Sequence, residues 1–506
     1  MNGFFILSLI LLYFGILYLI SYRIGKKHSE NAAFFLGNRK SPWYIVAIGT
    51  VGSSISGITF VSVPGMVGKF DMTYMQMVFG FLLGYAVIAF VLLPIYYKWN
   101  VTSIYSYLDQ RIGNNAYKTG AGFFILSRMI SSAIRLYIAV VILQTYIFEA
   151  WNVPFAVTAA GFLLMIWLYT HKSGIRTIVW TDLLQTIILL AALIIIIWQV
   201  AKGLNFDLSN IISSLKASSH SKIFVFDDWH SRQNFFKQFI SGAFITIAMT
   251  GVDQEMMQKN LSCKNLREAQ KNVCTGSLLF IPVNFLFLCL GILLLNYAFV
   301  NQIVLPESGD DILPMLVSNG YFGVSAIIFF VIGIIAVTFA SADSAMTGLT
   351  TSICIDFLNI SKFKENKAKK IRIFVHFLIS IIFIGIMLLF KAINNTSVID
   401  ALYILVSYTY GPLLGLFAFA IIFPLRRRGV TCRVSTNDRI VPYICILSPV
   451  LCFIISMILR TQFDYQLGYE LLIINALLVV AGCCCSTNLI TETIKKVKNF
   501  FFICIK

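Results

Sequence analysis

Charged residues are scarce in this sequence. Only 12% of its 506 residues are charged, whereas 58% are hydrophobic. Soluble domains carry roughly 25% charged residues, so the composition argues against a soluble protein. The apolar residues also gather in runs of around 20, the length that a helix needs to cross a hydrocarbon core of about 30 Å. The composition therefore predicts an all-α integral membrane protein.

The sequence also lacks the usual signs of appended domains and metal chemistry. No Pro-, Gly- or Ser-rich linker divides the chain, so we expect one membrane domain. The cysteines all follow residue 262 and form no C-x-x-C pair, which supports neither a zinc site nor a disulfide framework. No two histidines have ligand spacing, and only His376 falls inside an apolar run. These absences argue against a membrane enzyme.

We expect about thirteen transmembrane helices, and basic residues concentrate in every second loop between them. The predicted spans are 3–22, 43–68, 72–97, 119–149, 154–170, 178–201, 236–252, 275–300, 324–358, 373–390, 398–424, 440–459 and 469–488. The basic segments are Arg23–Lys40, Lys98–Lys118, Lys172–Arg176, Lys259–Lys271, Lys362–Arg372, Arg426–Arg439 and Lys495–Lys506. By the positive-inside rule, these lie in the cytoplasm and the N-terminus lies outside, for a multi-pass protein of the plasma (inner) membrane. A nucleic-acid-binding protein would instead gather its charge on one patch.

The first apolar run, Phe4 to Ile20, has two possible interpretations. A signal peptide would carry a basic segment before the run and a small-residue cleavage site after it. This sequence has neither, and its basic residues follow the run. We therefore expect a retained first helix. The long segment 202–235 is predicted to be an external loop with one surface helix.

Two predicted spans are interrupted by small residues. The sequence GTVGSSISG occupies the middle of span 43–68, and Gly242 and Gly251 interrupt span 236–252 more weakly. Gly and Ser weaken a helix, and the carbonyls freed by a break inside a membrane can bind a cation. Close packing of helices through small residues is the alternative explanation. Two interrupted spans separated by four others fit an inverted five-plus-five repeat.

Two carboxylates fall inside predicted spans. A carboxylate at a helix centre costs about 2.5–3.5 kcal/mol on insertion scales, so it normally faces a cavity, a polar group or an ion. Asp182 lies one turn from the cytoplasmic end of its span and could be a helix-end acid, whereas Asp343 is deeper. Next to Asp343, one helix face carries Val337, Ser341, Ser344 and Gly348. Its hydroxyls could bind a cation or simply bond to backbone carbonyls of the same helix.

Two arginines share one face of span 119–149. Arg128 could extend toward a loop, but Arg135 lies near the middle of the span. An arginine at that depth needs an anion as its partner. Either a structural acid or a carboxylate on a transported solute could fill this role.

Five segments resemble the sodium:solute symporter family, from about Phe35 to Arg428. They are FFLGNRKSPWYIVAIGTVGSSISGITFVSVPG, SIYSYLDQRIG (103–113), GIRTIVWTDLLQT (174–186), TGVDQEMMQKNL (250–261) and FASADSAMTGLTTSICIDF (339–357). The resemblance implies thirteen spans, an external N-terminus and a leucine-transporter fold. Residues 1–42 would then form the first helix and a basic loop, 43–428 the transporter core, and 429–506 additional helices and a cytoplasmic tail.

The resemblance also implies where sodium, the co-transported ion, would bind. Its ligands would be the carbonyls of Gly52, Ile55 and Val337, together with side-chain oxygens at positions 340 and 341. Ser341 matches the family pattern, but Ala340 replaces a residue that is usually Ser or Thr. A possible second sodium site would use Asp182, Asp343 and Ser344. The carboxylate of Asp343 could alternatively bind a proton.

The substrate residues implied by the resemblance surround the first interruption. They are Ser53, Ser54, Ser56, Thr59, Gln76 and Arg135. Arg135 favours an acidic sugar or another carboxylate. We thus expect a sodium-coupled symporter that imports a small organic solute and works as a monomer. The alternatives are proton coupling, or a non-transporting sensor or scaffold, which would usually carry a cytoplasmic signalling domain.

Overall fold

The computed structural model describes residues 3–25, 31–171, 174–393, 398–423, 438–465 and 467–486. Nine helical segments in these ranges are long and apolar enough to cross a membrane, two bent helix pairs make two more, and two apolar helices are shorter. The thirteen predicted spans are thus all present as helices, and the described residues contain no strand. The principal helices are α1 (Gly3–Gly25), α5 (Tyr74–Val87) continuing into α6 (Leu93–Lys98), α8 (Asn114–Leu143), α9 (Phe155–Thr170), α10 (Ile175–Gly203), α14 (Leu266–Val300), α16 (Gly323–Ser352), α17 (Glu365–Ile393), α18 (Val398–Ile422), α19 (Val441–Phe463) and α20 (Leu471–Cys485).

The first bent pair lies where the sequence predicts an interrupted span. Helix α3 (Trp43–Ser54) ends at Ile55, whose backbone is extended, and α4 (Gly57–Phe70) continues at an angle of 60°. Gly52 and Gly57 have no side chains and serines stand at the break, so this segment favours a continuous helix only weakly. The interruption is therefore a true break in the helix.

The second bent pair corrects the sequence-based prediction. Helix α12 (Phe235–Thr246) passes through a π-helical turn, Ile247–Gly251, and then bends by 68° into α13 (Gln254–Leu261). Gly242, predicted to interrupt the span, instead lets the α12 backbone approach the carbonyl of Met77. The predicted span 236–252 was too short, because α13 turns back into the protein and all eight of its residues are buried.

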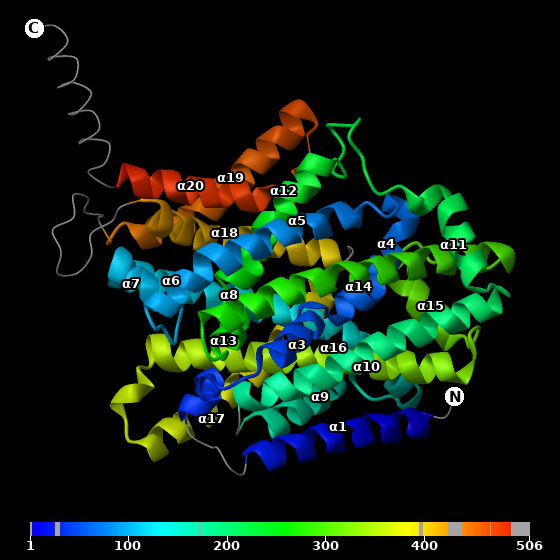
Figure 1. The fold of residues 1–506 in the computed structure, drawn as a ribbon, viewed down its shortest axis with the longest axis horizontal. Helices are drawn as coiled ribbons and strands as arrows, with labels where there is room; N and C mark the ends of the chain where they lie inside the picture. Colours follow the sequence, from blue (N-terminus) through cyan, green and yellow to red (C-terminus); the bar gives the residue numbers. More distant parts are fainter. Residues whose placement is uncertain are drawn as a thin grey trace, which may run out of the picture.

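Four spans, α5, α8, α9 and α10, separate the two bent pairs, as an inverted repeat of five spans requires. Helix α16 lies among α3, α8, α10 and α13, and every residue from Ile334 to Ser352 is buried. In Figure 1, α1 and α20 lie at opposite edges of the molecule, with α3, α10 and α16 between them. The polar residues of α16 are thus held inside the protein.

Segment 202–235 carries the α-helix α11 (Leu208–Ala217), which has no buried residue, in agreement with the predicted surface helix. The smaller helices are α2 (Asn31–Leu36), α7 (Ser106–Arg111) and α15 (Ile312–Ser318). The predicted domain boundary at 428/429 and the basic tail Lys495–Lys506 lie outside the described residues, as do parts of the basic segments beginning at Arg23, Lys172 and Arg426.

Candidate functional site

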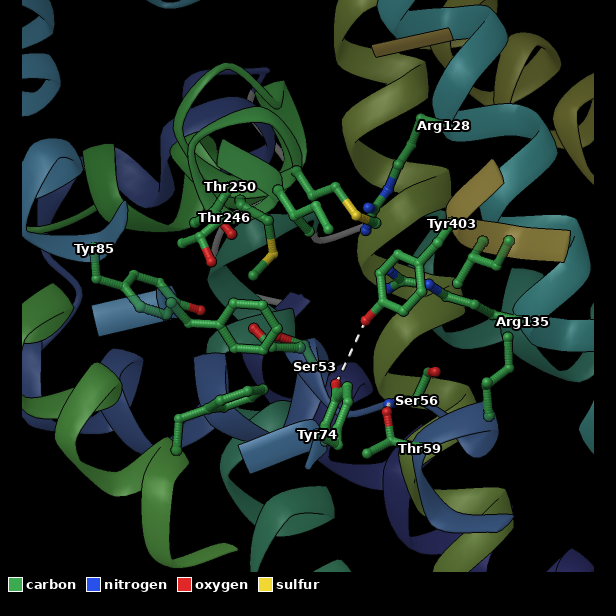
Figure 2. A pocket seen from close by; sticks show the side chains of 18 residues that line it. Ser53, Ser56, Thr59, Tyr74, Tyr85, Arg128, Arg135, Thr246, Thr250 and Tyr403 are labelled. Carbon is green, nitrogen blue, oxygen red and sulfur yellow. Dashed lines mark hydrogen bonds between the residues drawn. The ribbon is translucent and has the colours of Figure 1, made fainter. Parts of the chain in front are cut away.

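A cavity of about 80 Å³ lies beside the first helix break (Figure 2). Its walls come from α3, α4, α5, α8, α12, α13, α14 and α18. Five of the six predicted substrate residues line it: Ser53, Ser54, Ser56, Thr59 and Arg135. Further hydroxyls come from Tyr74, Tyr85, Thr246, Thr250 and Tyr403, and the apolar wall includes Ile58, Phe81, Ile245, Met249, Met256, Phe280 and Leu402. The structure therefore brings residues from both halves of the core to one small polar cavity.

The two arginines of α8 have different surroundings. Arg128 is 2% exposed and forms ion pairs with Asp253, at 3.6 Å, and with Glu255. Both acids are completely buried, and the hydroxyl of Tyr410 also donates to Asp253 at 2.6 Å. The sequence reasoning missed these two acids because it placed them in a loop. Arg128 therefore has structural partners and does not extend toward a loop.

Arg135, one heptad further along α8, lines the cavity without such a partner. Within the described part of the chain, no carboxylate lies within ion-pair distance of its guanidinium, and its Nε has no hydrogen-bond partner. Figure 2 shows Arg135 beside Tyr403 on one side of the cavity, opposite Tyr85, Thr246 and Thr250. The unpaired guanidinium is therefore available for an anionic group of a bound solute.

Gln76 is the one predicted substrate residue that does not line this cavity. Its amide nitrogen donates to the carbonyls of Thr73, at 3.2 Å, and Gln233, at 2.8 Å. Its amide oxygen accepts from the backbone nitrogen of Val225 at 3.0 Å. In this structure, Gln76 therefore holds segment 202–235 against α5 and does not line the cavity.

A pair of tyrosines lies between this cavity and a second cavity of about 380 Å³, which we call the outer cavity because it borders segment 202–235, predicted to be external. The hydroxyls of Tyr74 and Tyr403 lie 3.5 Å apart, and Tyr74 lines both cavities. The outer cavity is lined by residues in and near segment 202–235, among them Lys69, Arg232 and Lys237. The tyrosine pair therefore lies at the boundary between the two cavities.

The candidate sodium ligands lie where α3 ends against α10 and α16. The last four carbonyls of a helix have no partner within that helix, and α3 ends at Ser54. In the described chain, no hydrogen bond outside the helices ends on the carbonyl of Gly52 or Ile55. Helix α16 lies close to the break, because a Cβ added at Gly57 would be 3.1 Å from Thr338 Oγ1. These carbonyls and the negative end of the helix dipole suit a cation.

On α16, Ser341 and Ala340 are both buried near this helix end. The hydroxyl of Ser341 donates to the carbonyl of Val337 at 2.8 Å, so its lone pairs remain free to accept or to bind a cation. Ala340 supplies no side-chain oxygen. Among the described residues, no cluster of three or more His, Cys, Asp or Glu side chains could hold a metal ion. The candidate oxygens that the sequence analysis named at the first break are carbonyls and the Ser341 hydroxyl.

The second break is chemically different from the first. The hydroxyl of Tyr96 donates to the carbonyl of Gly251 at 2.9 Å, and that of Tyr105 donates to Val252 at 3.1 Å. The side chain of Gln254 bonds to the backbone of Thr102 and Ile104. Protein donors therefore occupy the carbonyls freed by the second break.

The three residues predicted to form a second sodium site lie in a buried region with an unpredicted lysine. The ammonium nitrogen of Lys259, on α13, lies 2.7 Å from Oδ2 of Asp182, on α10. Asp343 accepts hydrogen bonds from Tyr169 at 2.8 Å and from Ser344 at 3.2 Å. Asp182 is 1% exposed, so the structure rejects the alternative of a helix-end acid that reaches water. The prediction of Lys259 in a cytoplasmic loop was wrong, because the 68° bend directs α13 into the core.

A family model described as "Sodium:solute symporter family" matches residues 34–427. The chain is 22% identical over 435 residues to the sodium/sialic acid symporter SiaT of Proteus mirabilis, a match covering 83% of this chain and 85% of that protein. It is 24% identical to the human sodium/iodide cotransporter over 58% of this chain and 45% of that protein. It is 27% identical to the human sodium-coupled monocarboxylate transporter 1 over 49% and 39%, respectively. The chain therefore spans less than half the length of these two human relatives.

Solved structures show the same fold. A substrate-bound, outward-open sodium-coupled sialic acid symporter superposes with a TM-score of 0.79 and 18% identity, covering 94% of this chain and 96% of that one. A closed nucleobase-cation-symport-1 family transporter gives a TM-score of 0.53 at 11% identity, covering 89% and 92%. These likenesses confirm the predicted inverted-repeat architecture.

Proposed function

Because this chain belongs to the sodium:solute symporter family, we propose that it imports a small carboxylate together with sodium across the plasma membrane. In this proposal the central cavity is the solute site, and the first helix break is the sodium site. Binding of sodium at the end of α3 stabilises the state that is open to the outside. The solute then completes the site, and both are released inside.

The unpaired guanidinium of Arg135 carries the proposal of a carboxylate substrate. Arg128, seven residues away, has two buried acids beside it and needs no further anion. Arg135 has no ion pair among the described residues, and it lines the cavity. An arginine binds a carboxylate through charge-assisted hydrogen bonds, which are stronger than those between neutral groups. The hydroxyls of Ser54, Ser56 and Thr59 complete the polar wall around this anion.

The names of the relatives support the same chemistry. Sialic acid and monocarboxylates, which appear in the names of several relatives, both carry a carboxylate. Iodide, in the name of another relative, is also an anion. The proposal therefore concerns the charged group and leaves the rest of the solute open.

For sodium, we propose the carbonyls of Gly52, Ile55 and Val337 and the hydroxyl of Ser341 as ligands. Carbonyl and hydroxyl oxygens are the ligands that hard cations prefer. The absence of a hydroxyl at Ala340 leaves one ligand position to the backbone or to water. Because solute and sodium stabilise the same state, each should increase the apparent affinity for the other.

The decisive experiment is uptake by proteoliposomes of the purified protein. Sialic acid, pyruvate, lactate, glucose, proline and iodide would be compared with and without an inward sodium gradient. We expect sodium-driven uptake of at least one carboxylate and none of the neutral solutes. Uptake driven by a proton gradient but not by sodium would contradict sodium coupling. Sodium-driven uptake of neutral solutes alone would contradict the carboxylate proposal.

The remaining features of the proposal concern topology and assembly. We propose an external N-terminus, a cytoplasmic C-terminus and a functional monomer without nucleic-acid partners or enzymatic activity. The alternating basic loops support this orientation. Residues 43–428 would form the transporter core, with the first helix and the C-terminal helices packed around it.

A further inference from the structure

A third cavity, of about 420 Å³, lies between the first helix and α9. Helix α1 contributes Leu7 and Ile10 to its wall, and α9 contributes residues from Val157 to Met165. The end of α8 and the turns that lead from α8 to α9 form the remaining wall. The cavity shares no lining residue with the central or the outer cavity. We call it the α1–α9 cavity.

The wall of the α1–α9 cavity is apolar. Among the described residues that line it, only Thr158 carries a hydroxyl, and that hydroxyl donates to the side-chain oxygen of Gln144 at 2.5 Å. The amide nitrogen of Gln144 in turn donates to the carbonyl of Val153 at 2.7 Å. An apolar cavity of about 150 Å³ in another protein stays dry and binds benzene. The α1–α9 cavity therefore suits a hydrocarbon ligand several times larger than benzene.

Aromatic rings and a cation lie at one end of this cavity. The ring of Trp151, which lines the cavity, contacts those of Phe4 and Phe148, with centroids 4.7 and 5.9 Å apart. At the same end, Lys391 in the last turn of α17 places its Nζ 4.5 Å from the ring centroid of Phe155, the first residue of α9. Tryptophan is enriched where a membrane meets water, and an ammonium group binds phosphate. This end of the cavity is therefore suited to a lipid headgroup.

The surface around the α1–α9 cavity faces the surroundings of the protein. Only 28% of the most apolar stretch of α1 is buried, and Figure 1 shows α1 at the edge of the molecule, with α9 beside it. Leu11 and Leu12 on α1, and Val157 and Leu164 on α9, are each more than half exposed. In a chain that spans a membrane, such leucines and valines contact acyl chains. The cavity is thus continuous with a surface that faces hydrocarbon.

The dimensions of the cavity favour one acyl chain over a helix of a partner protein. Its α9 wall, from Val157 to Met165, extends about 12 Å along the helix axis. Dividing the volume by this length gives a mean cross-section of about 35 Å². A helix with its side chains is about 10–12 Å across, and its cross-section is therefore at least twice as large.

We propose that the α1–α9 cavity binds one acyl chain of a membrane phospholipid, whose phosphate lies near Lys391, and that this chain holds α1 against the rest of the protein. In the orientation proposed above, the lipid belongs to the outer leaflet. The proposal does not depend on which solute or ion the protein transports.

The test is native mass spectrometry and thermal unfolding of the purified protein, with palmitoyl-oleoyl-phosphatidylglycerol as the added lipid. We expect the wild-type chain to retain a single phospholipid in mild detergent and to melt at a higher temperature when the lipid is added. Gly161→Leu should lower the retained lipid several-fold and abolish the lipid-dependent rise in melting temperature. Gly161 lines the cavity, and a Cβ added there meets no atom within 4 Å, so the new side chain can occupy the cavity without overlap.

Two further variants separate the cavity from the general lipid-facing surface. Gly385→Leu is the matched control, because its added Cβ also meets no atom within 4 Å but lies on α17, away from the cavity wall. It should retain lipid as the wild type does. Lys391→Gln removes the cation proposed to bind the phosphate and should also lower the retained lipid.

Three results would overturn the proposal. Loss of all phospholipid from the wild-type protein under these conditions decides against it without any variant. Equal retention by Gly161→Leu and Gly385→Leu would mean that the lipid binds elsewhere on the surface. A free fatty acid or a second protein chain, held by the wild type and lost in Gly161→Leu, would assign the cavity to a different ligand. None of these readouts requires uptake, so a failure of the proposed transport function would leave them unaffected.

Discussion

The hydroxyl oxygens of Tyr74 and Tyr403 lie 3.5 Å apart, between a small inner cavity and a larger outer one. Tyr74 belongs to α5, in the first repeat, and Tyr403 belongs to α18, at the end of the second. The contact therefore joins the two halves of the core on the outer side of Arg135. Movement of one repeat against the other would change this distance.

Replacing Tyr74 with alanine should open the path from the outer cavity. We expect Ser54→Cys to react several-fold faster with an external thiol reagent when Tyr74→Ala is also present, because the blocking ring is gone. The label would be located by mass spectrometry, since the chain has other cysteines. Tyr74→Phe keeps the ring and serves as the control. Equal labelling rates in all three backgrounds would mean that the pair does not limit access.

Alanine substitution should mainly reduce solute affinity at Arg135 and mainly reduce protein stability at Arg128. Arg135→Ala removes a cation without leaving a buried acid unpaired, so we expect a melting temperature near that of the wild type. Apparent affinity for a transported carboxylate should fall about 10- to 150-fold, corresponding to the loss of a charged hydrogen bond. Arg128→Ala leaves Asp253 and Glu255 unpaired and should destabilise the protein by about 3–5 kcal/mol.

These two arginine variants test the assignment of roles as a pair. Uptake assays and thermal unfolding in detergent would be run on both proteins. Full carboxylate uptake by Arg135→Ala would exclude this residue as the anion-binding group. A large loss of stability in Arg135→Ala, with none in Arg128→Ala, would reverse the assignment.

The hydroxyl of Ser341 should contribute to sodium affinity. Ser341→Ala removes one oxygen ligand, and we expect the half-saturating sodium concentration for uptake to rise about tenfold, equivalent to about 1.4 kcal/mol. Ala340→Ser adds the oxygen that the sequence lacks and should lower that concentration. Sodium titrations of initial uptake rates measure both. Unchanged sodium dependence in both variants would remove this turn of α16 from the sodium site.

Gly52 should tolerate no side chain. A Cβ at this position would overlap Thr186 Oγ1 and lie 2.8 Å from Thr186 Cβ. Overpacking of this kind costs about 1–3 kcal/mol, so Gly52→Ala should lower the melting temperature and reduce uptake. Thr186→Gly in the same chain should partly restore both. Gly385→Ala is the matched control, because no atom lies within 4 Å of its added Cβ.

Gln76 offers a test between the sequence-based prediction and the structure. Gln76→Ala removes three hydrogen bonds to the backbone around the external loop. We expect faster tryptic cleavage of this loop after Lys222 or Arg232, with the half-saturating solute concentration unchanged. The opposite pattern, a protected loop and weaker solute binding, would support the predicted role as a substrate ligand.

The sequence predicts the spans and the first helix break well because their signals are local. A run of apolar residues identifies a span, and GTVGSSISG marks the break without knowledge of the fold. Ser53, Ser54, Ser56 and Thr59 follow directly from that break, since they lie within one turn of it. Their assembly into one cavity with Arg135 is the nonlocal part that the family resemblance supplied.

The sequence does not reveal the charged residues of the second bent pair. A glycine precedes Asp253, Glu255 and Lys259, and polar residues surround them. A short basic loop has the same local sequence pattern. Only the 68° bend shows that α13 returns to the core, and only the packing of α8 and α10 supplies the partners. An ion pair between residues far apart in the sequence does not change the hydropathy of either segment, so hydropathy cannot predict it.

The carbonyls freed at the two helix breaks have different hydrogen-bond partners. This difference between the repeats affects how their sequences could diverge after a gene duplication. At the second break, the hydroxyls of Tyr96 and Tyr105 donate to the freed carbonyls. These hydrogen bonds lie within the chain and need no ligand. In the proposed function, the carbonyls of the first break instead bind a sodium ion that arrives and leaves in each cycle. Substitutions that alter ion or solute preference should therefore accumulate around α3 and α4. The second break should change only together with its tyrosines.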